Sequence, residues 1–196
     1  MNYFRRIFLN LDVNYFSTLM NIIPFHIYKI TYEPCLIIQF ENVWENVFFF
    51  KNHNLSDFNC LVFIGGIDYP ERENRFEILY NFLSQSFNSR LSIKTSVNEI
   101  TPIKSIVSIF PSANWWEREI WDLFGVFFID HPDLRRILTD YGFQGFPLRK
   151  DFPLTGYVEV VYDEKLKHVK VQPLQITQEF RFLDVVNPWS TLKNLL

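Results

Sequence analysis

Two stretches of alternating residues constrain the fold of this 196-residue chain more than any other feature. In the first stretch every second residue faces one side: Phe76, Ile78, Tyr80 and Phe82. The second stretch repeats the pattern: Leu91, Ile93, Thr95 and Val97. A period of two is typical of a strand with one face toward a core. The short connection between the stretches suits antiparallel neighbours, so a largely antiparallel sheet is expected.

Other segments predict the elements around this sheet. Apolar residues recur every three or four positions in residues 3–22, which predicts an amphipathic helix. Residues 25–32 and 34–40 are β-prone and are separated by Glu33-Pro34, which predicts a hairpin or two neighbouring strands. Residues 41–52 are ambiguous, with a weak case for a helix, whereas the dense apolar run of residues 58–67 predicts a buried strand.

A second helix is predicted over residues 115–124. Asn114 is a candidate N-cap with Glu117 three residues on, which is the spacing of a capping interaction. Gly125 is placed to end the helix, because glycine adopts a left-handed backbone conformation at little cost. The fold class that follows is α+β, with a largely antiparallel sheet and helices packed on one of its faces.

From residue 130 onward the sequence changes in kind. Five glycines and prolines interrupt any regular element between residues 142 and 156: Gly142, Gly145, Pro147, Pro153 and Gly156. Irregular stretches of this length in a compact domain are usually functional. A last pair of strands is predicted at residues 157–162 and 168–172. We therefore expect an α+β domain over residues 1–129 and an extended, partner-wrapping C-terminal segment over residues 130–196.

Composition excludes several classes of protein. The formal net charge is −3, so the chain lacks the excess of Lys and Arg that nucleic-acid binding requires. Its two cysteines, Cys35 and Cys60, are isolated from each other, which argues against a zinc or iron–sulfur motif. No apolar run reaches the length of a spanning helix, and no phosphate-binding loop or nucleophile motif occurs.

One candidate for chemistry lies on the predicted second helix. Glu119 and Asp122 are three residues apart and share a helix face, and paired carboxylates can act as general acid and base. The alternative is structural: Arg118 forms an ion pair with Asp122, while Trp116, Ile120 and Leu123 pack inward. We favour the structural interpretation, because no nucleophile or ligand-binding loop accompanies the two carboxylates.

Two further groups follow that helix. Asp130-His131-Pro132-Asp133 is compatible with a metal site shared with Glu119, but a single His beside Pro more often fixes a turn. The basic pairs Arg135-Arg136 and Arg149-Lys150 are too few for nucleic acid. Because the guanidinium of Arg matches carboxylates, salt bridges to acidic residues of a neighbouring protein are their expected use.

At these residues the sequence resembles a known family. Residues 116–125 and 131–138 are similar to the signature of the thirty-kilodalton subunit of respiratory complex I, the NADH:ubiquinone oxidoreductase. The resemblance continues in order along the chain: Thr139 to Phe143, Pro147 to Tyr157, Gln178 to Arg181 and Pro188-Trp189. It covers roughly residues 57 to 190. Phe146 departs from the pattern, because this family is expected to have His there.

The resemblance implies a structural or assembly subunit without catalytic residues. Its place would be the quinone module of the peripheral arm, on the matrix side of the mitochondrial inner membrane, with membrane contact only through the complex. FMN and iron–sulfur clusters are implied in other subunits, and none in this chain. The implied partners are the forty-nine-kilodalton subunit and neighbouring iron–sulfur subunits. The residues implied to hold the fold or an interface are Glu117, Arg118, Glu119, Asp122, Gly125, His131, Pro132, Asp133, Arg135, Arg136, Arg149, Lys150 and Asp151.

Two rival interpretations stay open at this point. One is an independent enzyme that uses Glu119 and Asp122, which predicts a monomer active without partners. The other is the related subunit of a chloroplast or cyanobacterial ferredoxin-driven complex, or of a bacterial complex I. Phe, Ile and Asn are abundant and Ala occurs once, a composition that AT-rich coding produces. This composition and the tail through Pro188-Trp189 favour a mitochondrially encoded subunit.

Overall fold

The computed structural model describes residues 29–30 and 34–181. The helix predicted over residues 3–22 lies outside the described residues. Contacts along the chain define two compact units, Met1–Leu154 and Thr155–Leu196, which are described separately below. None of the described helices is long and apolar enough to cross a membrane.

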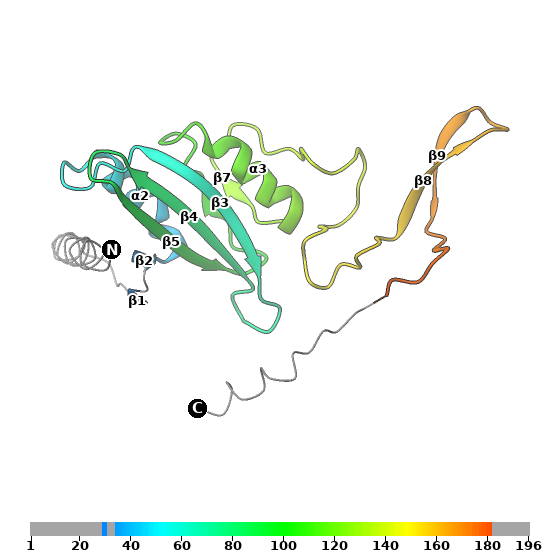
Figure 1. Cartoon of the computed structure of the whole chain (residues 1–196), viewed down its shortest axis with the longest axis horizontal. Helices are drawn as coiled ribbons and strands as arrows, with labels where there is room; N and C mark the ends of the chain where they lie inside the picture. Colours follow the sequence, from blue (N-terminus) through cyan, green and yellow to red (C-terminus); the bar gives the residue numbers. More distant parts are fainter. Residues whose placement is uncertain (1–28, 31–33, 182–196) are drawn as a thin grey trace, which may run out of the picture. The chain divides into compact units, whose positions relative to one another are not determined.

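The first unit contains a five-stranded sheet (Figure 1). Its strands follow the order β1-β2-β5-β4-β3. Their bounds are β1 Lys29–Ile30, β2 Pro34–Ile37, β3 Cys60–Asp68, β4 Phe76–Ser84 and β5 Ser89–Val97. Neighbours are antiparallel except β2 and β5, which are parallel. The largely antiparallel sheet, the β4–β5 hairpin and the antiparallel β1–β2 pair are confirmed.

One face of this sheet carries the core. Burial alternates along β4 and β5, so the residues that share a face are the ones the sequence pattern predicted. Tyr80 lies opposite Ile93, and Ile78 lies opposite Thr95; all four are fully buried. The strand predicted at residues 58–67 is present as β3, but it is buried on one face only, with Val62 and Ile67 exposed on the other.

The helices cover the core face of the sheet. A short 3-10 helix, η1 (Phe40–Asn42), leads into α2 (Val43–Asn52), which confirms the weak helical prediction for this segment. Val43, Val47 and Phe50 recur at helical spacing and are buried in the same core cluster as the strands. Helix α3 (Ala113–Phe124) adds Ile120 and Phe124 to that cluster, so the α+β class is confirmed.

The ends of α3 were predicted with mixed success. Gly125 follows the helix with φ +81° and donates its N–H to the carbonyl of Trp121, as predicted. The N-terminal prediction was wrong: the helix begins at Ala113, and Ser112 rather than Asn114 occupies the N-cap position. Glu117 does not cap the helix, because its carboxylate points into the core, where it accepts hydrogen bonds from residues outside the helix.

Two short strands flank α3 in the sequence. β6 (Ile103–Lys104) and β7 (Phe128–Ile129) pair in parallel and form a separate small sheet. Two-residue strands are too short to show a period of two, so sequence patterns give no signal for them.

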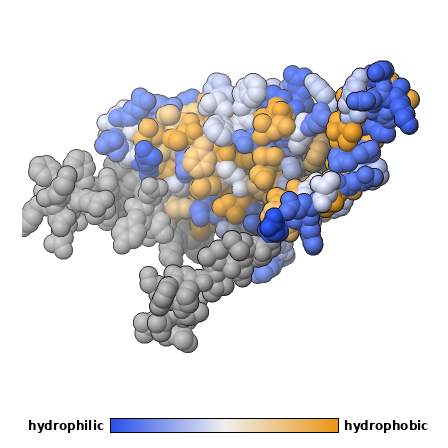
Figure 2. All heavy atoms as spheres, turned by 45° about the vertical axis from the view of Figure 1, so that its right-hand side comes forward, coloured by the Kyte–Doolittle hydropathy of each residue, from blue (hydrophilic) through white to orange (hydrophobic). Residues whose placement is uncertain are grey.

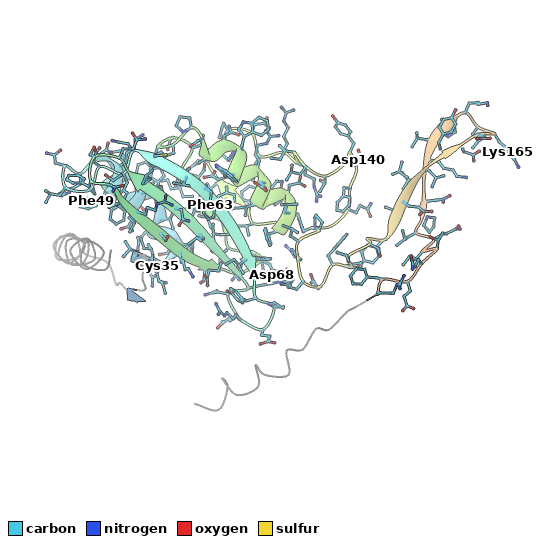
Figure 3. All side chains as sticks on the ribbon, viewed as in Figure 1. Cys35, Phe49, Phe63, Asp68, Asp140 and Lys165 are labelled. Atoms are coloured by element: carbon cyan, nitrogen blue, oxygen red, sulfur yellow. The ribbon has the colours of Figure 1, made fainter. Side chains whose placement is uncertain are left out.

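Residues 130–154 have neither helix nor strand, as predicted. They group with the first unit by contacts, although the division after residue 129 as a functional boundary stays a prediction. In the second unit, β8 (Val158–Asp163) and β9 (His168–Pro173) form an antiparallel hairpin whose turn contains Lys165 (Figure 3). This hairpin confirms the last predicted pair of strands.

The close approach of β3 to α3 yields a stability prediction. A Cβ atom on Gly66 would lie 2.9 Å from the ring of Phe124, whereas one on Gly65 would meet only the ring of Phe63, at 3.1 Å. Phe124 is buried and cannot move freely, but Phe63 is partly exposed. We therefore expect Gly66→Ala to lower the free energy of unfolding by about 1–3 kcal/mol. Urea denaturation should show a clearly smaller loss for the matched variant Gly65→Ala; equal losses would contradict this packing argument.

Candidate functional site

Asp122 holds the irregular segment to α3. Its side chain is fully buried, and its carboxylate accepts backbone N–H bonds from Ile137 (3.2 Å), Leu138 (2.7 Å) and Thr139 (2.9 Å). The hydroxyl of Thr139 donates a fourth bond at 2.6 Å, and Arg136 lies 3.5 Å away. Burial alone would raise the pKa of Asp122, but the hydrogen bonds from Thr139, Leu138 and Ile137 outweigh it and lower that pKa.

The geometry of Asp122 bears on the interpretation of the predicted carboxylate pair. Both carboxylate oxygens of Asp122 accept hydrogen bonds from residues 137–139. The predicted Arg118–Asp122 ion pair was wrong: Arg118 instead donates from Nε to the carbonyl of Arg135 at 3.0 Å. Glu119 is partly buried, and its side chain makes no hydrogen bond or ion pair with other described residues. Trp116 and Leu123 pack against the core, as predicted.

A second buried carboxylate, Asp68, lies at the end of β3 (Figure 3). It forms a bidentate ion pair with Arg75, at 2.7 and 2.9 Å, and accepts the backbone N–H of Lys150 at 2.7 Å. Arg75 also pairs with Asp151 at 2.9 Å and with Glu99 at 2.7 Å. The bond from Arg75 lowers the pKa of Asp68, and the bond to Asp68 raises the pKa of Arg75.

The Asp68 cluster was missed as a site by sequence reasoning. Arg75 and Asp151 are 76 residues apart, so no local spacing connects them. The resemblance implied a role for Asp151 only; Asp68 and Arg75 lie within its span, but no local motif singles them out.

Arg149 caps the C-terminal end of α3 with its side chain. Its Nε donates to the carbonyl of Phe124 at 2.6 Å, and its guanidinium lies over the rings of Phe146 (4.5 Å) and Phe76 (5.0 Å). A positive charge at this position also interacts favourably with the helix dipole. Phe146, where the family is expected to have His, therefore serves as a stacking partner. A Cβ on Gly125 would lie 2.7 Å from Arg149 and Phe146, so space as well as backbone conformation requires glycine there.

Glu117 and His131 form a buried polar cluster beneath α3. Glu117 accepts hydrogen bonds from the hydroxyl of Ser105 at 2.6 Å and from the N–H of Ile106 at 2.9 Å. His131 Nε2 lies 3.9 Å from Glu117 and 3.3 Å from the carbonyl of Asn114. Burial raises the pKa of Glu117 to about 7, against the effect of its two hydrogen bonds, and burial lowers the pKa of His131.

The role of His131 follows from its two nitrogens. Nδ1 accepts the N–H of Asp133 at 3.1 Å, so the neutral ring carries its proton on Nε2 and donates it to Asn114. The ring thus fixes the turn around the exposed Pro132. Among residues 34–181 no three potential metal ligands come together, and the carboxylate near His131 is Glu117 rather than Glu119.

The four basic residues expected at an interface divide into two kinds. Arg136 is turned inward: besides approaching Asp122, it donates to the carbonyl of Gly145 at 2.9 Å. Arg149 is likewise engaged within the first unit. The side chain of Arg135 is 74% exposed and, within the described part of the chain, pairs only with the exposed Asp133. Lys150 is exposed as well.

The two cysteines lie on different strands of the sheet. Cys35 is on β2 and Cys60 is on β3, with β5 and β4 between them. Three strand spacings of about 4.8 Å each separate the thiols. They can neither form a disulfide with each other nor share one cluster.

Comparison with solved structures first shows the fold. The chain resembles a chain in the structure of the membrane-bound sulfane sulfur reductase, an archaeal respiratory membrane complex, with a TM-score of 0.60 and 23% identity over 70% of this chain and 83% of that one. At that identity the likeness shows a shared fold.

Sequence relatives then give the family. Residues 36–158 match the model of the respiratory-chain NADH dehydrogenase, 30 Kd subunit. The chain is 60% identical to NADH dehydrogenase [ubiquinone] iron-sulfur protein 3 of Beta trigyna over 72% of its length and 73% of the relative. It is 52% identical to the protein of the same name from Marchantia polymorpha, over 91% of this chain and 93% of the relative. The chain belongs to the thirty-kilodalton subunit family of respiratory-chain NADH dehydrogenase, and its partners are other subunits of that complex.

The buried carboxylate Glu117 predicts a pH-dependent stability. Its pKa is about 7 in the folded chain and 4.5 in the unfolded one, so the folded state holds the proton more tightly. The contribution of Glu117 to stability is therefore fully present below about pH 4.5 and is lost as the pH rises to about 7, a fall of roughly 3 kcal/mol from this group. Glu117→Gln should remove this fall.

Urea unfolding between pH 5 and 8 tests this expectation. His131 acts in the opposite sense, because its lowered pKa stabilises the fold at higher pH, so the difference between the wild type and Glu117→Gln isolates Glu117. Parallel pH profiles of the two proteins would rule the expectation out.

Asp122 predicts a local effect on the irregular segment. Asp122→Asn replaces one acceptor oxygen by a donor group facing three backbone N–H groups, so we expect a loss of about 2–4 kcal/mol. Amide exchange of residues 137–139 should accelerate more than exchange in β4. The matched control is Glu119→Gln on the same helix, with an expected effect within about 0.5 kcal/mol. Unchanged exchange at residues 137–139 in Asp122→Asn would show that the carboxylate does not hold this segment.

Proposed function

We propose that this chain is a structural subunit of the peripheral arm of the complex and supplies no catalytic group. The observation that carries the proposal is the saturation of Asp122 by four hydrogen bonds from the segment it holds. A carboxylate in this state gives up bonding energy whenever it accepts a proton. The role of Asp122 is therefore to hold residues 137–139 in position.

Asp122 and Asp68, two buried carboxylates with lowered pKa values, together organise the irregular segment. Asp122 holds its beginning to α3, and Asp68 holds Lys150 near its end to β3. Arg136 and Arg149 add hydrogen bonds to the carbonyls of Gly145 and Phe124. A segment without helix or strand thereby acquires a defined shape, which reduces the entropy lost when a partner binds it.

The exposed residues of this segment suit a protein partner. Leu138 is 61% exposed, Leu154 is 77% exposed and Tyr141 is fully exposed, and such side chains commonly dominate binding at interfaces. Hydrophobic residues lie between hydrophilic ones on the face shown in Figure 2. We assign this contact to the forty-nine-kilodalton subunit and neighbouring iron–sulfur subunits in the quinone module, on the matrix side of the mitochondrial inner membrane. Contact with the membrane would come only through the complex.

We further propose that the chain binds no cofactor of its own. The relatives are named iron-sulfur proteins, but a cluster needs several thiolates in one place, and this chain has two cysteines three strands apart. FMN and the iron–sulfur clusters would then belong to other subunits. The four hydrogen bonds that Asp122 accepts speak against an independent enzyme based on Glu119 and Asp122.

Arg149 provides the test of a structural role. Arg149→Ala leaves the carbonyl of Phe124 without its donor and removes the stacking on Phe76 and Phe146, so we expect about 2 kcal/mol less stability. The amount of assembled complex should fall, whereas turnover per assembled complex should stay unchanged. Blue native electrophoresis combined with NADH:ubiquinone activity measures both quantities. Normal assembly with lost turnover would overturn the proposal.

The exposed basic residues serve as matched controls. Arg135→Ala removes one exposed ion pair with Asp133, and Lys150→Ala removes an exposed side chain, so the stability of the chain should change by less than about 0.5 kcal/mol in each. Reduced assembly in these variants, at unchanged stability, would identify Arg135 or Lys150 as direct contacts to an acidic partner surface.

A further inference from the structure

The β8–β9 hairpin has two faces of opposite character. Residues directly opposite each other in an antiparallel pair lie on the same face. Three pairs form the first face: Val158–Pro173, Val160–Val171 and Tyr162–Val169. The other three pairs form the second face: Glu159–Gln172, Val161–Lys170 and Asp163–His168. The first set, called the apolar face below, contains no charged residue.

The second face satisfies its own polar groups. Gln172 donates to Glu159 at 2.6 Å, and Lys170 pairs with Asp163 at 2.8 Å. Val161 is 37% exposed, the least of the valines in the hairpin. This face therefore has the character of a surface in contact with water.

Within the described residues of the second unit, the apolar face lacks a comparable cover. Its valines are between 54% and 67% exposed, and Tyr162 is 56% exposed. The exposed apolar area is on the order of 500 Å², at the upper end of the patches found on monomeric proteins. A two-stranded hairpin is also only marginally stable alone and needs a further layer against one face.

We propose that the apolar face packs against an apolar surface of another subunit of the respiratory complex. This inference deepens the proposed structural role and rests on it. The absence of charge on all six positions fits an apolar protein surface and not an acidic or phosphate-bearing one. A second copy of the chain fits less well, because about 500 Å² per partner is below the roughly 800 Å² that a stable interface buries. In a multisubunit complex this face needs to supply only part of a larger contact.

Adjacent residues of opposite orientation give the sharpest test. A photoreactive benzophenone side chain is placed at Val171, on the apolar face, or at Gln172, on the opposite face, and the assembled complex is purified and irradiated. Mass spectrometry then identifies the cross-linked chains. We expect position 171 to cross-link to another subunit at least about tenfold more than position 172. Equal yields, or cross-links only within this chain or between two copies of it, overturn the inference.

A second pair of variants tests the energetic consequence. Val160→Asp places a carboxylate on the apolar face, whereas Val161→Asp places it beside Lys170 on the polar face. The first should reduce assembled complex about tenfold or more, and the second by less than about twofold. Equal losses of assembled complex in the two variants would overturn the inference, even if the chain itself is needed for assembly. Failure of the structural role itself would appear differently, as normal assembly with lost turnover in Arg149→Ala.

Discussion

The structure depends on one constraint: the backbone N–H groups of its irregular segment need hydrogen-bond acceptors. Residues 130–154 have no helix or strand, so their backbone N–H groups lack the partners that regular structure provides. Buried carboxylates on rigid elements supply part of what is missing: Asp122 on α3 accepts three N–H groups, and Asp68 on β3 accepts a fourth. Because an ionised carboxylate is a strong acceptor, two residues suffice to tie both ends of the segment to the core.

Helix α3 shows how the number of donors sets the state of a buried carboxylate. Asp122 receives four hydrogen bonds and lies near Arg136, and its pKa is lowered although it is buried. Glu117, five residues earlier, receives two, and burial raises its pKa to about 7. The same helix thus carries one residue that binds a segment by its charge and another that is close to neutrality in the core. Neither state requires a catalytic role.

Sequence reasoning succeeded where the signal was local. Alternation in β4 and β5 specified both strands and the face of each that is buried, since adjacent residues of a strand point to opposite sides. Gly125 was identified for a similar reason, because only its own backbone conformation was at issue. Predictions about Asn114, Glu117 and Arg118 failed because they assumed partners within the helix, whereas Glu117 and Arg118 bind residues of other segments.

By itself, the sequence determined the α+β class, the irregular backbone after residue 129 and the family to which the chain belongs, because these depend on patterns of neighbouring residues. Only the tertiary structure decided which partners the charged side chains contact. Arg75 meets Asp151 across 76 residues, and Arg149 reaches the end of α3 across 25. No spacing in the sequence encodes such contacts, because they exist only once the sheet and helices have brought distant segments together.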